Sequence, residues 1–227
     1  MRRAYIEAHV DLERSLALAV KWAGRRASLH VPSTRSVHAF PLLAQLGLSI
    51  TSPSAKSKYY GPPRGMVIAW CLGVEHMINI EQSHAIDGVV VVRAHGAIEF
   101  AEGAANHAPW VTAYDVERLA GEVIRHVPEA PAPVKAAMKG TTGLAVPNQG
   151  LIDNRDRAPV VHALTHLRDH GVRLDPDEVM VEALRNGWGG DGPVEVREIV
   201  RDLNRGRRLR YDTDRILPER LQEWLNA

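Results

Sequence analysis

Four consecutive valines, Val89–Val92, most constrain how this chain can fold. A strand with one face in water alternates apolar and polar side chains, whereas an uninterrupted apolar run is typical of a strand buried on both faces. Arg93 and His95 follow the run directly. Strands of this kind lie inside parallel sheets, whose ligands bind at the carboxyl ends of the strands. The run therefore predicts an α/β fold and places Arg93 and His95 at a candidate site.

The chain before this run alternates short apolar segments with helical patterns. We expect further strands at Ala27–Val31, Leu48–Thr51 and Met66–Trp70, at the spacing of repeated strand–helix units. No helical pattern separates the second of these strands from the third, so that connection is irregular or the pair is antiparallel. Together these elements predict a three-layer α/β domain with a mostly parallel sheet of about four to five strands.

Three segments carry weaker patterns. Apolar side chains recur at helical spacing in residues 3–24, which predicts one amphipathic helix at the N-terminus. The same spacing predicts a helix over Asp115–His126. Residues Ile98–Phe100 are expected to form one more short strand.

Prolines at 128, 131 and 133 favour an extended linker, because alternate prolines hold the backbone extended. We therefore expect two domains, an α/β domain over residues 1–130 and an all-helical module over 131–227. Helices in the second are predicted at Arg157–His170, at Asp175–Asn186, at Val194–Asn204 and from Pro218 onward.

The composition of the chain limits which partners and which cell compartment are expected for the protein. The formal net charge is +1, so any binding to nucleic acid or to another polyanion must come from a local patch. A single cysteine, Cys71, suits a reducing compartment. No apolar run approaches the roughly 18–20 residues of a membrane span. We therefore expect a cytoplasmic protein that has no membrane partner.

The loops expected at the carboxyl ends of the strands are rich in hydroxyls and cations. Such groups, together with backbone N–H groups at a helix start, are suited to an anionic ligand. The candidate ligand-binding residues are Ser33, Thr34, Arg35, Lys58, Arg64, Arg93 and His95. A solvated basic loop with ordinary helix caps is the structural alternative.

Other chemistry has less support in the sequence. The segment from His162 to His166 lacks the glutamate of the zinc motif, and neither the dinucleotide fingerprint nor the P-loop pattern occurs, so we expect no metal and no cofactor. Cys71 falls between a predicted strand and a helix, where a nucleophile is often found. A small core residue is the simpler interpretation of a lone cysteine.

Three functional hypotheses follow from these patterns. The leading one is a non-catalytic or regulatory module that binds a nucleotide or nucleic acid at the carboxyl edge of the sheet. The second is an assembly protein that binds a protein partner or itself through the helical module, where arginines cluster at Arg205–Arg210. The third is an enzyme that uses Cys71 or His95.

Overall fold

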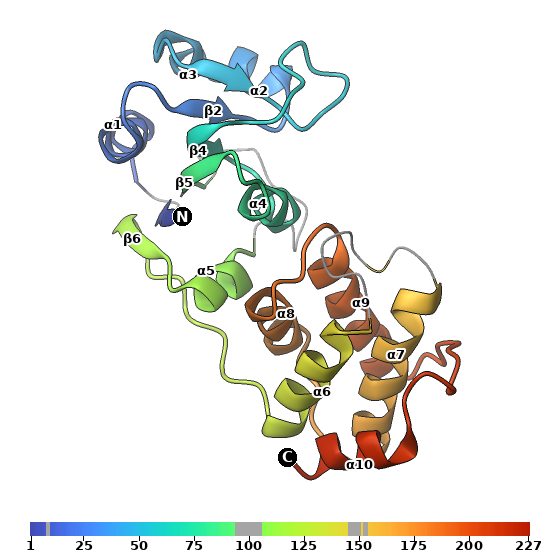
Figure 1. Ribbon diagram of the computed structural model, residues 1–227. Helices are drawn as coiled ribbons and strands as arrows, with labels where there is room; N and C mark the ends of the chain where they lie inside the picture. Colours follow the sequence, from blue (N-terminus) through green and yellow to red (C-terminus); the bar gives the residue numbers. More distant parts are fainter. Residues whose placement is uncertain (8–9, 94–105, 145–150, 152–153) are drawn as a thin grey trace. The chain divides into compact units, whose positions relative to one another are not determined.

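The computed structural model describes residues 1–7, 10–93, 106–144, 151 and 154–227 (Figure 1). The chain divides into two compact units, one of residues 1–107 and 114–125 and the other of residues 108–113 and 126–227. The first unit is α/β and the second is helical among its described residues. The expected boundary at residues 130 and 131, and the independent folding of residues 131–227, stay predictions.

The first unit is built on a parallel sheet of six strands in the order β3-β2-β4-β5-β1-β6. The strands are β1 (Arg2–Ile6), β2 (Ser28–His30), β3 (Ser49–Thr51), β4 (Gly65–Trp70), β5 (Ile86–Val92) and β6 (Glu117–Ala120). The valines of β5 are at most 1% exposed, and β4 and β1 flank the strand. The predicted α/β class and the buried central strand are confirmed, with six strands in place of four to five.

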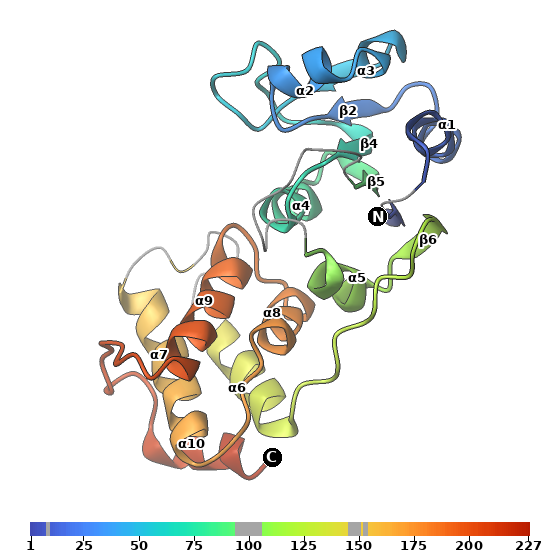
Figure 2. The same cartoon turned by 180° about the vertical axis from the view of Figure 1, so that it is seen from behind.

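Helices cover both faces of the sheet (Figures 1 and 2). They are α1 (Leu12–Ala23), α2 (Thr34–Ala39), α3 (Leu42–Gln45) and α4 (Val74–Glu81). Because successive side chains of a strand point to opposite faces, Val90 and Val92 of β5 share one core with Leu16 of α1 and Leu43 of α3. Helix α4 packs against β5 from the other side, which completes the three layers.

Two segments that were expected to be helical each contain a strand of the sheet. Residues Arg2–Ile6 form β1, which lies between β5 and β6, and the N-terminal helix begins only at Leu12. Asp11 caps that helix by accepting a hydrogen bond from the backbone N–H of Arg14 at 2.9 Å. The prediction of a helix over Asp115–His126 is also wrong, because Glu117–Ala120 is the edge strand β6. In both segments pairing within the sheet overrides the local helical pattern.

The connection between β3 and β4 is irregular, which is one of the two possibilities that the sequence leaves open. Both strands are parallel neighbours of β2, and no helix lies in residues 52–64 between them. The alternative of an antiparallel pair is wrong. The strand expected at Ile98–Phe100 lies outside the described residues.

The second unit contains the helices α5 (Ala108–Tyr114, whose last residue belongs to the first unit), α6 (Ala132–Thr142), α7 (Asn154–Asp169), α8 (Pro176–Arg185), α9 (Gly192–Asn204) and α10 (Pro218–Leu225). Helix α6 begins inside the proline segment, because Pro133 occupies the first turn, where a helix needs no N–H donor. Large apolar side chains from α6 to α10, among them Met138, Leu164 and Trp224, form one core. No helix among the described residues is long and apolar enough to cross a membrane.

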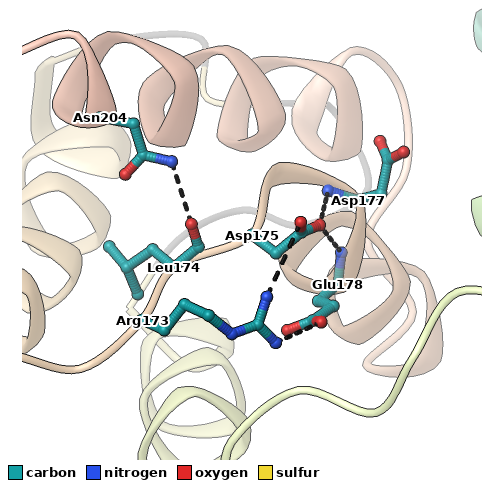
Figure 3. A network of polar contacts seen from close by, with 6 residues as sticks. All are labelled: Arg173, Leu174, Asp175, Asp177, Glu178 and Asn204. Atoms are coloured by element: carbon teal, nitrogen blue, oxygen red, sulfur yellow. Dashed lines mark hydrogen bonds and ion pairs between the residues drawn. The ribbon is translucent and has the colours of Figure 1, made fainter.

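A polar network fixes the start of α8 (Figure 3). Asp175 accepts a hydrogen bond from the backbone N–H of Glu178 at 3.2 Å. The guanidinium of Arg173 contacts the buried carboxylate of Glu178 at 2.5 Å. Asn204, at the end of α9, donates to the carbonyl of Leu174 at 2.9 Å and so ties the two helices together. The cap that the sequence predicts from Asp175 and Pro176 is therefore reinforced by tertiary contacts.

Candidate functional site

The carboxyl ends of β2 and β3 lie side by side at one corner of the sheet. The two strands are parallel and in register, with Leu29 opposite Ile50 and His30 opposite Thr51. The loops that leave them, residues 31–33 and 52–64, therefore begin next to each other. This register brings together two parts of the sequence that lie about twenty residues apart.

Hydroxyl groups connect the first loop, and the start of α2 that follows it, to the second loop. The Oγ1 of Thr34 lies 2.9 Å from the Oγ of Ser57 and accepts a hydrogen bond from the backbone N–H of Lys58 at 3.1 Å. The buried Oγ of Ser52 donates to the carbonyl of Pro32 at 3.0 Å. The backbone positions of both loops are consequently fixed before any ligand arrives.

A pocket of about 470 Å³ opens between the two loops, and it is called the hydroxyl pocket below. Its lining residues are Ser33, Thr34, Arg35, Ser54, Lys56 and Ser57. Arg35 and Lys56 are exposed, and neither forms an ion pair with a described carboxylate. Four hydroxyls and two unneutralised cations form a surface that accepts an anion and repels no part of it.

Three of the predicted site residues, Ser33, Thr34 and Arg35, line this pocket. Lys58 lies next to it through its backbone, while its ammonium group stands 4.8 Å from the centre of the Tyr59 ring. Ser54, Lys56 and Ser57 belong to the long loop and also line the pocket, but they are not among the predicted site residues. Only the register of β2 and β3 shows that they face the start of α2.

Arg64 lies at the amino ends of the strands, whereas the hydroxyl pocket lies at their carboxyl ends. It immediately precedes β4, and its carbonyl accepts a hydrogen bond from Ser28, the first residue of β2, at 3.0 Å. The long loop starts at the carboxyl end of β3 and ends at the amino end of β4. The expectation that Arg64 joins the other residues at the carboxyl edge does not hold.

Arg93 is already engaged by a carboxylate. Its guanidinium lies 2.6 Å from Glu7, whose side chain is 6% exposed. Glu7 follows β1 as Arg93 follows β5, and these neighbouring parallel strands place both residues at the same edge. Glu7 is not among the predicted site residues, because residues 3–24 are expected from their spacing to form a helix. His95 lies outside the described residues.

A second pocket, of about 320 Å³, lies against the same long loop. Proline and tyrosine side chains form part of its wall, and its polar groups come from His30, Ser52, His76, Asn79 and Ser83. The Nδ1 of His30 is 2.8 Å from the Oγ1 of Thr51. Burial, and to a smaller extent the charge of nearby His76, lower the pKa of His30 from 6.5 to about 4. His30 is therefore neutral at pH 7.

Cys71 occupies the turn between β4 and α4. Its backbone has a φ of 52°, a left-handed conformation that is unusual for a residue with a side chain. The residue is 4% exposed, so a substrate has little access to the thiol. The described residues contain no group of three or more histidine, cysteine or acidic side chains that could hold a metal ion.

Comparison with known protein families gives a match in the C-terminal part of the chain. Residues 131–225 match a family model described as "Domain of unknown function (DUF1889)". The matched part extends from Pro131, just before α6, to Leu225 at the end of α10, which is less than half of the chain. No curated protein and no solved structure matches the chain. The family description assigns no activity, so the function is argued from the geometry alone.

Proposed function

We propose that this protein binds a phosphate-bearing ligand, a nucleotide or a nucleic acid, in the hydroxyl pocket. The observation that carries the proposal is the composition of this pocket: four hydroxyls and two cations surround it, and no carboxylate lines it. A phosphate monoester carries about two negative charges at neutral pH, which Arg35 and Lys56 match. Hydroxyl donors then complete the hydrogen bonds of the phosphate oxygens.

The fixed loops also support binding. Order that exists before binding does not have to be created by the ligand, so less affinity is lost to entropy. The bonds from Thr34 to Ser57 and from Ser52 to Pro32 supply that order. Arg35 contributes a planar guanidinium suited to two parallel contacts with a phosphate, and Lys56 contributes a mobile point charge.

Arg64 and Arg93 are left out of the proposed site. Arg64 is at the other edge of the sheet, and Arg93 is paired with the buried Glu7. We also propose a cytoplasmic location, where the thiol of Cys71, which forms no disulfide, stays reduced.

The surface gives less support to the assembly hypothesis. Self-association or binding of a protein partner predicts an exposed apolar patch on the helical unit. Among the described residues of that unit, Leu217 is the one large apolar side chain that is exposed.

The test is isothermal titration calorimetry of the full chain at low salt with ATP, inorganic pyrophosphate and a short single-stranded oligonucleotide. The double variant Arg35→Gln and Lys56→Gln should weaken binding at least tenfold, since each lost charged hydrogen bond costs roughly 1.5–3 kcal/mol. Arg64→Gln is the matched control, because it removes a cation from the same loop outside the pocket, and it should leave the affinity within about twofold. The proposal fails if none of these compounds binds, or if the double variant binds as tightly as the control.

A further inference from the structure

The helical unit carries a separate basic pocket. This pocket has a volume of about 530 Å³ and lies between the first turn of α7 and the irregular segment after α9. Its lining residues are Arg155, Arg157, Ala158, Arg210, Tyr211, Asp212 and Arg215. We call it the arginine pocket. Three of its guanidiniums, those of Arg157, Arg210 and Arg215, outnumber the single carboxylate of Asp212, which leaves an excess of about two positive charges.

Three of these arginines differ from most other arginines of the helical unit in having no ion pair with a described carboxylate. Eight of the others form ion pairs with aspartate or glutamate; they are Arg168, Arg173, Arg185, Arg197, Arg201, Arg205, Arg207 and Arg220. Arg157, Arg210 and Arg215 form no ion pair with any carboxylate that the structure describes. Like charges that share one pocket repel each other, so this cluster destabilises the unliganded fold and would be relieved by an anion.

Contacts to α7 hold the segment that follows α9 in place. Arg215 donates a hydrogen bond to the backbone carbonyl of Arg155. The Tyr211 ring stacks on the ring of His162, with 5.1 Å between the centroids and 23° between the planes. The segment therefore has a defined position although it forms neither helix nor strand. The Arg215 guanidinium, which is held in this way, loses little freedom when it binds a ligand.

We propose that the arginine pocket binds a compact ligand that carries a diphosphate or triphosphate group. Such a group carries about three to four negative charges at neutral pH, and the cations Arg157, Arg210 and Arg215 can pair with most of them. Guanidiniums form paired hydrogen bonds with phosphate oxygens. The volume is within the range of about 300–1,000 Å³ that is typical of small-molecule sites. A nucleic-acid strand, in contrast, spreads its charges one per nucleotide along an extended groove.

The test uses the full chain with Arg35→Gln and Lys56→Gln already in place, so that the hydroxyl pocket does not contribute. Inorganic pyrophosphate, inorganic triphosphate, ATP and a short single-stranded oligonucleotide are titrated by calorimetry. Adding Arg157→Gln and Arg210→Gln should raise the Kd for pyrophosphate and triphosphate at least tenfold. The control pair Arg205→Gln and Arg220→Gln removes the same charge outside the pocket, and it should change the Kd less than twofold.

The remaining outcomes are equally decisive. Equal affinity for ATP and triphosphate means that the pocket recognises the phosphate chain alone, whereas tighter binding of ATP means that it recognises a nucleoside as well. Arg210→Gln alone provides a second measurement on an exposed side chain, in case the variant at Arg157 unfolds. The proposal is overturned if no phosphate compound binds, if pocket and control variants behave alike, or if only the oligonucleotide binds. Because the background variant lacks both cations of the hydroxyl pocket, and because every comparison is made within that background, none of these results depends on the proposed function.

Discussion

Acid is expected to destabilise the α/β unit through His30. The residue is 4% exposed, and its pKa is lowered to about 4, first by burial and second by the charge of His76. Hydrogen bonding with Thr51 raises the pKa but does not compensate for burial. In the unfolded chain the same imidazole has a pKa near 6.5. Protonation of His30 therefore favours unfolding.

The sign and size of the effect follow from proton linkage. Between pH 6.5 and about 4 the unfolded chain binds more protons at this site than the folded chain does, so stability rises with pH across that window. The contribution of neutral His30 is fully present above about pH 6.5 and is lost as the pH falls towards 4. At roughly 1.4 kcal/mol for each unit between the two pKa values, the loss is about 3 kcal/mol.

Urea unfolding at several pH values between 7 and 4 measures this loss. The variant His30→Asn keeps a polar group near Thr51 but does not titrate, so its stability should fall by about 3 kcal/mol less than that of the wild type over this range. Titrating groups that do not interact with His30 contribute equally to both proteins. His84→Gln is the control, because His84 is an exposed histidine of the same unit, and it should follow the wild type. The same pH dependence in His30→Asn as in the wild type would refute the reasoning.

Two further predictions concern the helical unit. Gly140→Ala places a Cβ 2.5 Å from Cε2 of Trp224 and should destabilise the unit by about 1–3 kcal/mol in urea unfolding. Gly143→Ala, where no neighbouring atom lies within 4 Å, should be neutral or stabilising, and equal effects of the two variants would contradict the packing argument. Limited proteolysis should cut between Val127 and Lys135 and release a folded helical fragment. Uniform resistance in that segment would show that the two units share one core.

The sequence predicts the elements whose signals are local. The uninterrupted valines of β5 indicate a strand buried on both faces, and the sheet has neighbours on both sides of it. Helix α8 begins where Asp175 and Pro176 predict it, because capping depends on residues within one turn. In contrast, β1 and β6 have side chains with helical spacing, and only their partners in the sheet make them strands.

In the candidate site, too, features with a local sequence signal were predicted, and features that depend on long-range contacts were not. Ser33, Thr34 and Arg35 were predicted from their position after a strand and before a helix, and they line the hydroxyl pocket. Arg64 was grouped with them because it belongs to the loop that leaves the strand Leu48–Thr51, although that long loop carries it to the amino end of β4. The partner of Arg93 was not predicted, because Glu7 belongs to a strand whose existence depends on a long-range pairing.

The sequence by itself therefore determined the α/β class, the central strand, most helices of the second unit and the basic, hydroxyl-rich character of the loops. These properties depend on periodicity, capping and composition, which act over a few residues. The tertiary structure decided which strands are neighbours and which charges meet. The order β3-β2-β4-β5-β1-β6 brings Lys56 to Arg35 and Glu7 to Arg93. Strand order depends on how the whole chain buries its apolar faces, and no short stretch of sequence contains that information.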